Sequence, residues 1–221
     1  MHEPAPAAPQ SRFFLSHRGL PFETVIDVVL KDRAGQPKVA RLRDGRILKL
    51  FRNSRRPSLR WFYPTSFRFR HAAGRLRGLG IPVPDVEHVF FHLPSWQHGV
   101  IYRPLAGSTL EEHGIGASLL TPLATLVAGL HHAGIYFRGL HPGNIVLCGD
   151  GSLGLIDFGS ARFFRRPLNA RYRERNLNLM VRMPAHRALF SEHDWRDFLQ
   201  RYRTIARRLD PAIDAPLDIP L

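Results

Sequence analysis

The chain has 221 residues, of which 44% are hydrophobic and 10% aromatic. These values exclude a disordered protein and are typical of one domain, or two small ones, with a real hydrophobic core. The single cysteine, Cys148, excludes an internal disulfide framework and a multi-cysteine zinc site. No apolar run approaches the ~20 residues that span a bilayer. The amino terminus lacks the basic start and apolar stretch of a signal peptide, so we expect a cytoplasmic protein.

The chain is strongly basic, with 32 basic residues, 18 acidic residues and a formal net charge of +14. Lys31, Lys38 and Lys49 are the lysines, and the other 29 basic residues are arginines. Such a field attracts polyanions: nucleic acid, anionic lipid or phosphorylated sugar. No zinc-finger, homeodomain or RNP-type pattern is present, which argues against nucleic acid as a partner. An ordinary solvated surface and contact with an anionic glycolipid or a membrane surface both stay open.

The order of apolar stretches and turn signals predicts strands first and helices later. In the first part we expect strands at 22–30, 39–43 and 46–51, a helix at 67–79, and strands at 86–93 and 99–102. The Asp44-Gly45 pair predicts a hairpin turn. In the second part we expect a short helix from Thr109, an apolar helix at 119–132, a hairpin at 144–147 and 153–156, and mostly helix from 171 to 209.

This order predicts an α+β protein with two lobes. We expect a disordered segment at 1–18, a small antiparallel-sheet lobe at 19–102, a reduced helical lobe at 103–209, and an extended, proline-containing tail at 210–221.

Three features in chain order indicate phosphate chemistry. Lys49 lies inside an apolar strand, and its ammonium is a compact point charge that suits a phosphate. Asn144 ends the segment 137–144, and Asp157 begins Asp-Phe-Gly thirteen residues later. An amide oxygen and a carboxylate at the two ends of a short hairpin can share the hard cations that hold a nucleotide's phosphates.

In these residues the chain resembles the protein kinases over about residues 20–205. The resemblance implies a kinase-like fold with a sheet lobe and a helical lobe. It implies that Lys49 meets the phosphates and that Asn144 and Asp157 hold Mg²⁺. It also implies that Tyr102 and Leu105, in the hinge between the lobes, lie beside the adenine of ATP.

Four phrases are similar to a narrower group of bacterial kinase-like proteins. They are Gly80-Ile-Pro-Val-Pro, Tyr102-Arg-Pro-Leu-Ala-Gly, Leu140-His-Pro-Gly-Asn-Ile and Asp194-Trp-Arg-Asp-Phe-Leu. The group comprises the lipopolysaccharide core sugar (heptose or Kdo) kinases and the related small toluene-tolerance proteins. This resemblance implies ATP and Mg²⁺ as cofactors and a sugar hydroxyl of an anionic glycolipid or sugar phosphate as acceptor. It places the protein in the cytoplasm, with peripheral contact with the inner membrane.

The kinase pattern is broken at three places. The loop aspartate that orients the acceptor hydroxyl is replaced by Gly139, and of His-Arg-Asp only Arg138 is kept. No glycine-rich loop occurs between the first two strands. The helix expected at 67–79 offers no acid to pair with Lys49.

These departures leave several functions open. One is an atypical kinase in which His141 serves as the base, although a structural or phosphate-facing role for this histidine is the alternative. A second is a pseudokinase that binds nucleotide or glycolipid as a regulator or scaffold. A third is a basic protein associated with nucleic acid. The acids considered for the place of the missing base are Glu111, Glu112 and Asp150. His131 and His132 are expected to contact helix carbonyls or solvent.

Overall fold

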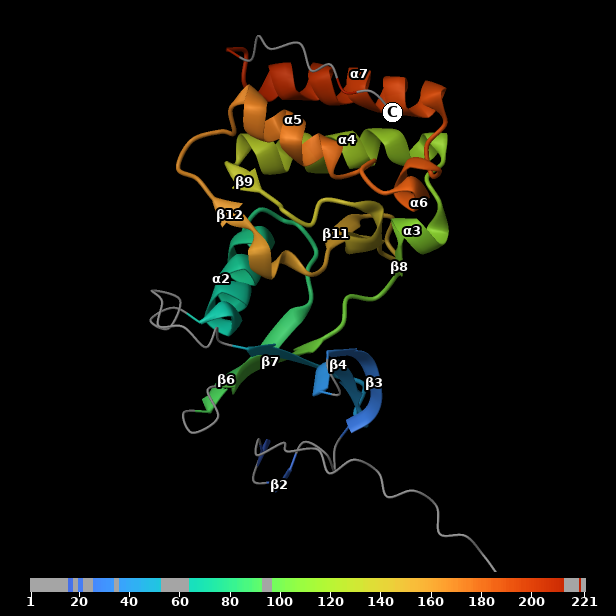
Figure 1. Ribbon diagram of the computed structural model, residues 1–221. Helices are drawn as coiled ribbons and strands as arrows, with labels where there is room; N and C mark the ends of the chain where they lie inside the picture. Colours follow the sequence, from blue (N-terminus) through green and yellow to red (C-terminus); the bar gives the residue numbers. More distant parts are fainter. Residues whose placement is uncertain are drawn as a thin grey trace, which may run out of the picture. The chain divides into compact units, whose positions relative to one another are not determined.

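The computed structural model describes residues 16–17, 20–21, 26–33, 36–52, 64–92, 97–212 and 219 (Figure 1). Within these ranges, no helix combines the length and apolarity needed to cross a membrane. The chain divides into two compact units: residues up to 67 together with 86–103, and residues 68–85 together with 104–221. Most of the segments expected as a disordered start and an extended tail fall outside the described residues. The division into lobes at 19–102 and 103–209 stays a prediction.

The first unit is built on a five-stranded sheet (Figure 1). Its strands are β3 (Ile26–Arg33), β4 (Gln36–Leu42), β5 (Ile47–Arg52), β6 (Asp85–His92) and β7 (Gln97–Arg103). The spatial order is β3-β4-β5-β7-β6, and β3 to β4, β4 to β5 and β5 to β7 pair antiparallel. The two-residue strands β1 (Ser16–His17) and β2 (Leu20–Pro21) pair separately. The small antiparallel sheet predicted from the sequence is confirmed.

Alternation along the strands gives this sheet two faces of different chemistry. On one face Leu42, Leu48 and Ile101 form a buried apolar cluster, against which Leu50 and Phe90 pack. Residues 49 and 51 of β5 point to the opposite face, where the register sets Lys49 beside Val100 and Phe51 beside His98. Because successive side chains of β5 point to opposite faces of the sheet, the Lys49 side chain lies on the face away from the apolar cluster.

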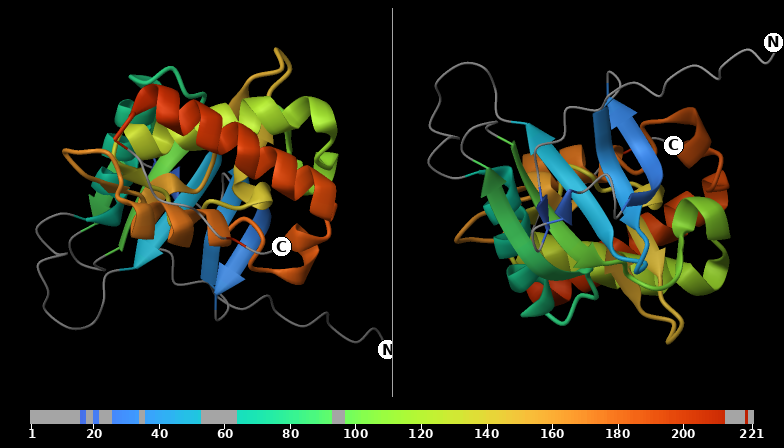
Figure 2. Two further views of the ribbon diagram at one scale, coloured as in Figure 1. Left: turned by 90° about the horizontal axis from the view of Figure 1, so that it is seen from above. Right: turned by 90° about the horizontal axis from the view of Figure 1, so that it is seen from below.

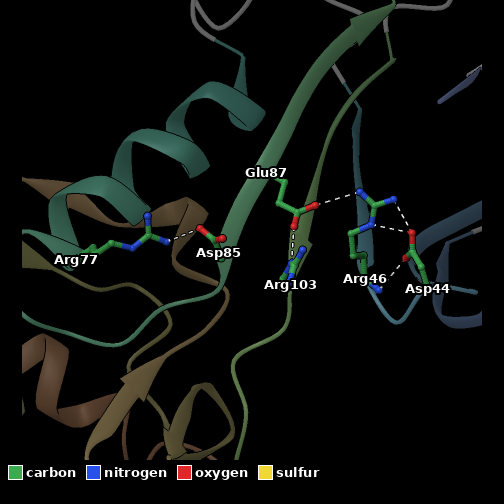
Figure 3. A network of polar contacts seen from close by, with 6 residues as sticks. All are labelled: Asp44, Arg46, Arg77, Asp85, Glu87 and Arg103. Carbon is green, nitrogen blue, oxygen red and sulfur yellow. Dashed lines mark hydrogen bonds and ion pairs between the residues drawn. The ribbon is translucent and has the colours of Figure 1, made fainter. Parts of the chain in front are cut away.

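Glu87 of β6 joins the strands around β5 through two arginines (Figure 3). Arg103 Nε donates to one of its carboxylate oxygens, and Arg46 Nη1 donates to the other at 3.0 Å. These hydrogen bonds, that of Arg103 first, hold the pKa of Glu87 below its ordinary value. Arg46 also donates to Asp44 in the hairpin turn. The network ties the start of β5 to β6 and β7, which fixes the strand that carries Lys49.

The second unit is mainly helical. Its helices are α2 (Thr65–Arg77, of which Arg68 onward belongs to this unit), α3 (Leu110–His113), α4 (Ala117–His132), α5 (Ala170–Asn178), α6 (Pro184–Arg187) and α7 (Glu192–Leu209). Short strands β8 (Ser108–Thr109), β10 (Ile145–Leu147) and β11 (Leu153–Leu155) form a sheet in the order β11-β10-β8. Strand β9 (Ile135–Tyr136) pairs with β12 (Arg162–Phe163). The predicted α+β fold is confirmed.

The core of this unit lies where α7 packs along α4 (Figures 1 and 2). The buried residues of α7 recur at helical spacing: Trp195, Phe198, Leu199, Tyr202 and Ala206. Ser191 caps this helix by accepting from the backbone N–H of Asp194 at 3.0 Å. Trp195 Nε1 donates to the carbonyl of Ile219 at 3.0 Å, so a residue near the end of the chain is also buried against α7.

Candidate functional site

The predicted site residues fall on both units. Lys49 and Tyr102 belong to the first unit, and Leu105, Arg138, His141, Asn144 and Asp157 belong to the second.

Lys49 is buried in the middle of its sheet, with 7% of its surface exposed. Its ladder partners are Val39 of β4 and Val100 of β7. The ammonium lies 5.9 Å from the centroid of the Phe51 ring, at the distance of a cation–π contact. Tyr102 pairs with Ile47 in the same sheet and is half-buried. The structure thus buries the Lys49 ammonium among apolar neighbours of β4, β5 and β7.

In the second unit Leu105 packs against Gly154 of β11. The next residue of that strand, Leu155, donates its N–H to the carbonyl of Pro82 at 2.9 Å. The segment that follows α2 and the segment that follows β7 therefore meet at the β10–β11 hairpin. This hairpin connects the two residues expected to bind cations, Asn144 before it and Asp157 after it.

Asn176 of α5 holds the start of the loop that runs from Phe137 to Asn144. Its amide Nδ2 donates to the carbonyl of Phe137 at 2.6 Å, and its Oδ1 accepts from the N–H of Phe137 at 3.2 Å. Both backbone polar groups of Phe137, its N–H and its carbonyl, thus bond to one side chain. The Phe137 ring is fully buried, so the loop starts from a fixed point.

His131 completes this buried network, and the expectation that it contacts helix carbonyls or solvent is wrong. Its Nε2 lies 3.2 Å from Asn176 Oδ1, and its Nδ1 lies 2.7 Å from the hydroxyl of Tyr202. Burial, and after it the charge of Arg173, lowers the pKa of His131 to about 3. The ring is therefore neutral and donates from Nε2 to the amide oxygen. His132, one residue later, is exposed as expected.

Asn144 has a fixed amide orientation. Its Nδ2 donates to the carbonyl of Gly139 at 3.0 Å and to His141 Nε2 at 2.9 Å. A carbonyl only accepts, so the nitrogen of the amide must face the loop, and Oδ1 faces the other way. The backbone carbonyl of Asn144 accepts from the N–H of Ile156 at 3.0 Å, which brings Asn144 next to the residue that precedes Asp157.

Asp157 has a left-handed backbone, with φ 53° and ψ 34°. Among the described residues it is the one non-glycine position with positive φ, and such a conformation persists where its surroundings hold it. Here the next residue, Phe158, is fully buried and stacks on Phe69 of α2 with ring centroids 4.5 Å apart. Asp157 itself is exposed. The buried Phe158 ring thus fixes the backbone at this point, and the Asp157 carboxylate lies on the surface.

An amide oxygen and a carboxylate are hard ligands of the kind that Mg²⁺ takes. No cluster of three or more histidine, cysteine or acidic side chains able to hold a metal occurs among the described residues. Two protein oxygens alone make an incomplete set. Mg²⁺ is commonly bound through one or two carboxylates together with substrate phosphates, and Asn144 with Asp157 fits that pattern.

The position of the missing aspartate is occupied by the side chain of Asn144. A Cβ on Gly139 would stand 2.8 Å from Asn144 Nδ2 and 3.2 Å from the Phe137 ring. Any side chain at 139 would have to displace an amide that is held by two hydrogen bonds. Arg138, the neighbouring residue kept from the kinase pattern, is exposed.

Of the three acids considered for the missing base, two have structural roles. Glu112 closes a capping box with Thr109 at the start of α3, and these hydrogen bonds lower its pKa. Asp150 accepts from the N–H and the hydroxyl of Ser152 in the β10–β11 turn. Glu111 is the acid that reaches the loop, where its Oε2 lies against Gly143.

His186 of α6 is a part of this site that no sequence pattern indicates. Its Nε2 lies 3.5 Å from Glu111 Oε1, and its ring stacks on that of His141 with centroids 4.8 Å apart and planes 12° apart. It is 45 residues from His141 in the chain, and no spacing signal connects the two. The loop histidine is thus enclosed between Asn144 on one side and the pair Glu111–His186 on the other.

Residues 109–202 match the family described as "Lipopolysaccharide kinase (Kdo/WaaP) family". The matched segment runs from β8 into α7 and includes the whole loop and Asp157. Among solved structures, the crystal structure of an aminoglycoside-3'-phosphotransferase of type VIII is similar to this chain. The match has a TM-score of 0.60 and 18% sequence identity, and it covers 85% of this chain and 87% of the other. A comparison with curated proteins gave no match. The resemblance to the lipopolysaccharide kinases and the kinase-like fold are both confirmed.

Proposed function

We propose that this protein binds ATP with Mg²⁺ and transfers the γ-phosphoryl group to a sugar hydroxyl of an anionic glycolipid. The observation that carries the proposal is the pair Asn144 and Asp157. Asn144 has its amide nitrogen turned into the loop, so its amide oxygen faces away from the loop. Asp157 is exposed on a constrained left-handed backbone. The match to the lipopolysaccharide kinase family supports the acceptor class.

In this function each of the predicted site residues has its own role. Lys49 supplies a positive charge for the phosphates of the nucleotide, and Tyr102 and Leu105 lie beside its adenine. The oxygens of Asn144 and Asp157 would hold the cation, which would neutralise the charge that develops on the phosphates during transfer. Arg138 is exposed and available to an anionic substrate.

The acceptor oxygen forms a bond to the γ-phosphorus while the bond to the β–γ bridging oxygen breaks and ADP leaves. His141 Nε2 already accepts a hydrogen bond from Asn144, which favours a positioning role for this histidine over that of a base. The hydroxyl proton passes to water or to a phosphate oxygen. Phosphoryl transfer depends mainly on positioning and charge, so it tolerates this arrangement.

The test is the melting temperature with and without ATP and Mg²⁺. A ligand at 100 times its Kd stabilises the native state by about 2.7 kcal/mol, which for a chain of this size raises the melting temperature by about 5–10 °C. The rise should require Mg²⁺ and be lost in Lys49→Ala and Asp157→Asn. Asparagine is chosen because it tolerates the left-handed backbone. Lys38→Ala and Asp27→Asn, at exposed positions, are the matched controls. No rise at millimolar nucleotide in a folded sample would exclude the proposal.

The second candidate is a pseudokinase that binds nucleotide or glycolipid without transfer. The observation in its favour is Gly139, whose side-chain space is taken by Asn144. Single-turnover incubation with γ-labelled ATP and lipopolysaccharide core acceptors separates the two. Label in the glycolipid supports the kinase, whereas nucleotide binding without label in any acceptor supports the pseudokinase.

We also propose where the protein meets the anionic surface that carries its acceptor. Arg75 of α2 lies over the Phe163 ring of β12, 4.9 Å from its centroid, so these two elements are neighbours. Four exposed arginines lie in these two elements or within three residues of β12: Arg75, Arg162, Arg165 and Arg166, which we call the arginine face. No acidic residue occurs in the sequence between Asp44 and Asp85 or between Asp157 and Glu174. Phe164 is an exposed aromatic beside it.

Each arginine near an anionic membrane contributes about 1 kcal/mol. Changing Arg162, Arg165 and Arg166 to glutamine should therefore weaken binding to phosphatidylglycerol vesicles by about 100-fold, and salt should do the same to the wild type. The matched control changes Arg203, Arg207 and Arg208 of α7 to glutamine. Equal losses in both triple variants would show that only the net charge matters. Binding to nucleic acid in preference to the vesicles would support the third function considered from the sequence.

A further inference from the structure

We propose that Glu111 and His186 are positioning residues of the loop. They hold His141 in the tautomer that accepts from Asn144, and they thereby keep the amide oxygen of Asn144 turned away from the loop. The inference rests on the proposed function in one respect, since that oxygen is taken as a ligand of the nucleotide-bound cation.

The tautomer of His141 follows from the contacts of Asn144. The nitrogen of an amide donates and does not accept, so the atom that it meets at 2.9 Å, His141 Nε2, must carry the lone pair. In a neutral imidazole the hydrogen is then on Nδ1. The same amide nitrogen is held by the carbonyl of Gly139 at 3.0 Å, which excludes the flipped amide. If the hydrogen moved to Nε2, two N–H groups would face each other and the amide would lose one of its two anchors.

Glu111 stands where it favours that hydrogen on Nδ1. A Cβ on Gly143 would collide with Glu111 Oε2 and would lie 3.3 Å from His141 Nδ1. The carboxylate oxygen and the ring nitrogen therefore border the same small space, which is open because residue 143 is a glycine. No hydrogen bond joins the two atoms, so the carboxylate acts through space: its negative charge stabilises an N–H on this buried nitrogen and destabilises a lone pair.

His186 holds the carboxylate in this place. It is 3% exposed, its Nε2 lies 3.5 Å from Glu111 Oε1, and its ring covers that of His141. Its Nδ1 is buried and has no hydrogen-bond partner within the described part of the chain. The polar contact that the His186 ring makes is therefore the one between its Nε2 and Glu111. One carboxylate oxygen is directed to His186 and the other to the space beside Gly143.

The arrangement connects three elements to the cation ligand: α3 through Glu111, α6 through His186, and the loop through His141. Groups that orient a metal ligand in this way commonly change metal affinity by 10- to 100-fold when they are removed. The Asn144 side chain has several rotamers of its own, so its orientation needs such support. The four-residue helix α6 thus has the role of carrying His186 to the loop.

The tautomer is measured directly by ¹⁵N NMR of histidine-labelled protein without nucleotide, at one fixed pH. The His141 signals are assigned by their loss in His141→Gln. The wild type should show the hydrogen on Nδ1. Glu111→Gln should shift a large part of the population to the Nε2–H form, and Gly143→Ala, which displaces the carboxylate without removing it, should do the same. His186→Phe keeps the ring stack and loses the contact with Glu111, so it should give a smaller shift in the same direction.

The second readout is the affinity for Mn²⁺ in the presence of ADP, measured by electron paramagnetic resonance. We expect about a 10-fold loss in Glu111→Gln and in Gly143→Ala. The matched controls are Glu192→Gln and His113→Phe, at exposed positions, and these should match the wild type in both readouts. Melting curves show that each variant is folded.

An unchanged His141 tautomer in folded Glu111→Gln and Gly143→Ala would overturn the inference, even with a working nucleotide site. Unchanged Mn²⁺ affinity in these variants would overturn the part that concerns the cation. If the tautomer responds but the wild type binds no nucleotide, the positioning of Asn144 stands and the proposed function fails. The two proposals therefore fail on different measurements.

Discussion

At the scale of single residues, the surroundings of Gly139 predict that the missing aspartate cannot be restored by one substitution. Asn144 Nδ2 occupies the space next to its Cα. We expect Gly139→Asp to give no gain in phosphoryl transfer and to reduce the Mg²⁺-dependent rise in melting temperature, because it pushes the amide of Asn144 aside. Overpacking of this kind costs about 1–3 kcal/mol, and urea unfolding of Gly139→Ala should show it. Gly149→Ala is the control, since its added Cβ meets nothing within 4 Å. A gain in transfer by Gly139→Asp would contradict this account.

Asn176 gives a second prediction at this scale. Removing its side chain leaves the N–H of Phe137 buried and unpaired, takes one of two donors from the Phe137 carbonyl, and removes the acceptor of His131. Asn176→Ala should therefore lower the free energy of unfolding by about 2–5 kcal/mol. Hydrogen exchange at the Phe137 amide should accelerate as well. Asn178→Ala, on the exposed side of the same helix, should change neither quantity, and equal effects in both variants would mean that only α5 itself was weakened.

At the scale of elements, α7 depends on a residue ten positions beyond its end. Ile219 is 4% exposed, and its carbonyl accepts from Trp195 Nε1. Shortening the chain after Ala212 removes this burial and leaves the indole N–H without its acceptor, at a cost of about 2–4 kcal/mol. Thermal unfolding measures it. In a Trp195→Phe background the same shortening should cost less, because the indole N–H is already gone. Strict additivity of the two changes would show that the hydrogen bond contributes nothing.

The elements also show what local patterns can and cannot supply. The helix expected at 67–79 is Thr65–Arg77, and its buried face of Phe69, Ala72, Ala73 and Leu76 follows from spacing alone. The shift of two residues has a tertiary cause, because Ser66 is buried and its N–H donates to His98 of β7 at 3.3 Å. The hairpin between Asn144 and Asp157 was predictable because its turn chemistry is local.

The surroundings of the loop were not predictable in the same way. Glu111 was one of three acids that the sequence could not rank. The capping role of Glu112 is readable from Thr109, but the approach of Glu111 to Gly143 depends on how α3 packs. His186 and Asn176 reach the loop from helices far along the chain, and no periodicity or motif marks them. Contacts of this kind are set by packing between elements, which a single sequence does not encode locally.

At the scale of the whole molecule, stability should fall in mild acid. Burial lowers the pKa of His98 to about 4, and burial together with Arg173 lowers that of His131 to about 3. In the unfolded chain both titrate near 6.5, so below this pH the unfolded state binds more protons than the folded state. Their stabilisation is complete above about pH 6.5 and is lost as the pH falls toward 4, by up to about 1.4 kcal/mol per pH unit for each histidine.

Urea unfolding at pH 7.5, 6 and 5 measures this slope. His98→Gln should reduce the slope of the free energy of unfolding against pH by the contribution of one histidine. His88→Gln, at an exposed position, should leave this slope unchanged. His98 belongs to the first unit and His131 to the second, so each unit carries its own acid sensitivity. A slope identical in wild type and His98→Gln would show that other groups account for the acid sensitivity.

The hold of Asn176 on Phe137 has a consequence for how such a protein changes over time. The start of the loop is held by α5, outside the loop itself. Substitutions in the loop, Gly139 and Gly143 excepted, can therefore alter or abolish chemistry while the start of the loop keeps its place, and a lineage can exchange catalysis for recognition without rebuilding its architecture. An engineer who wants a new reaction from this chain should vary the loop and leave α5 untouched.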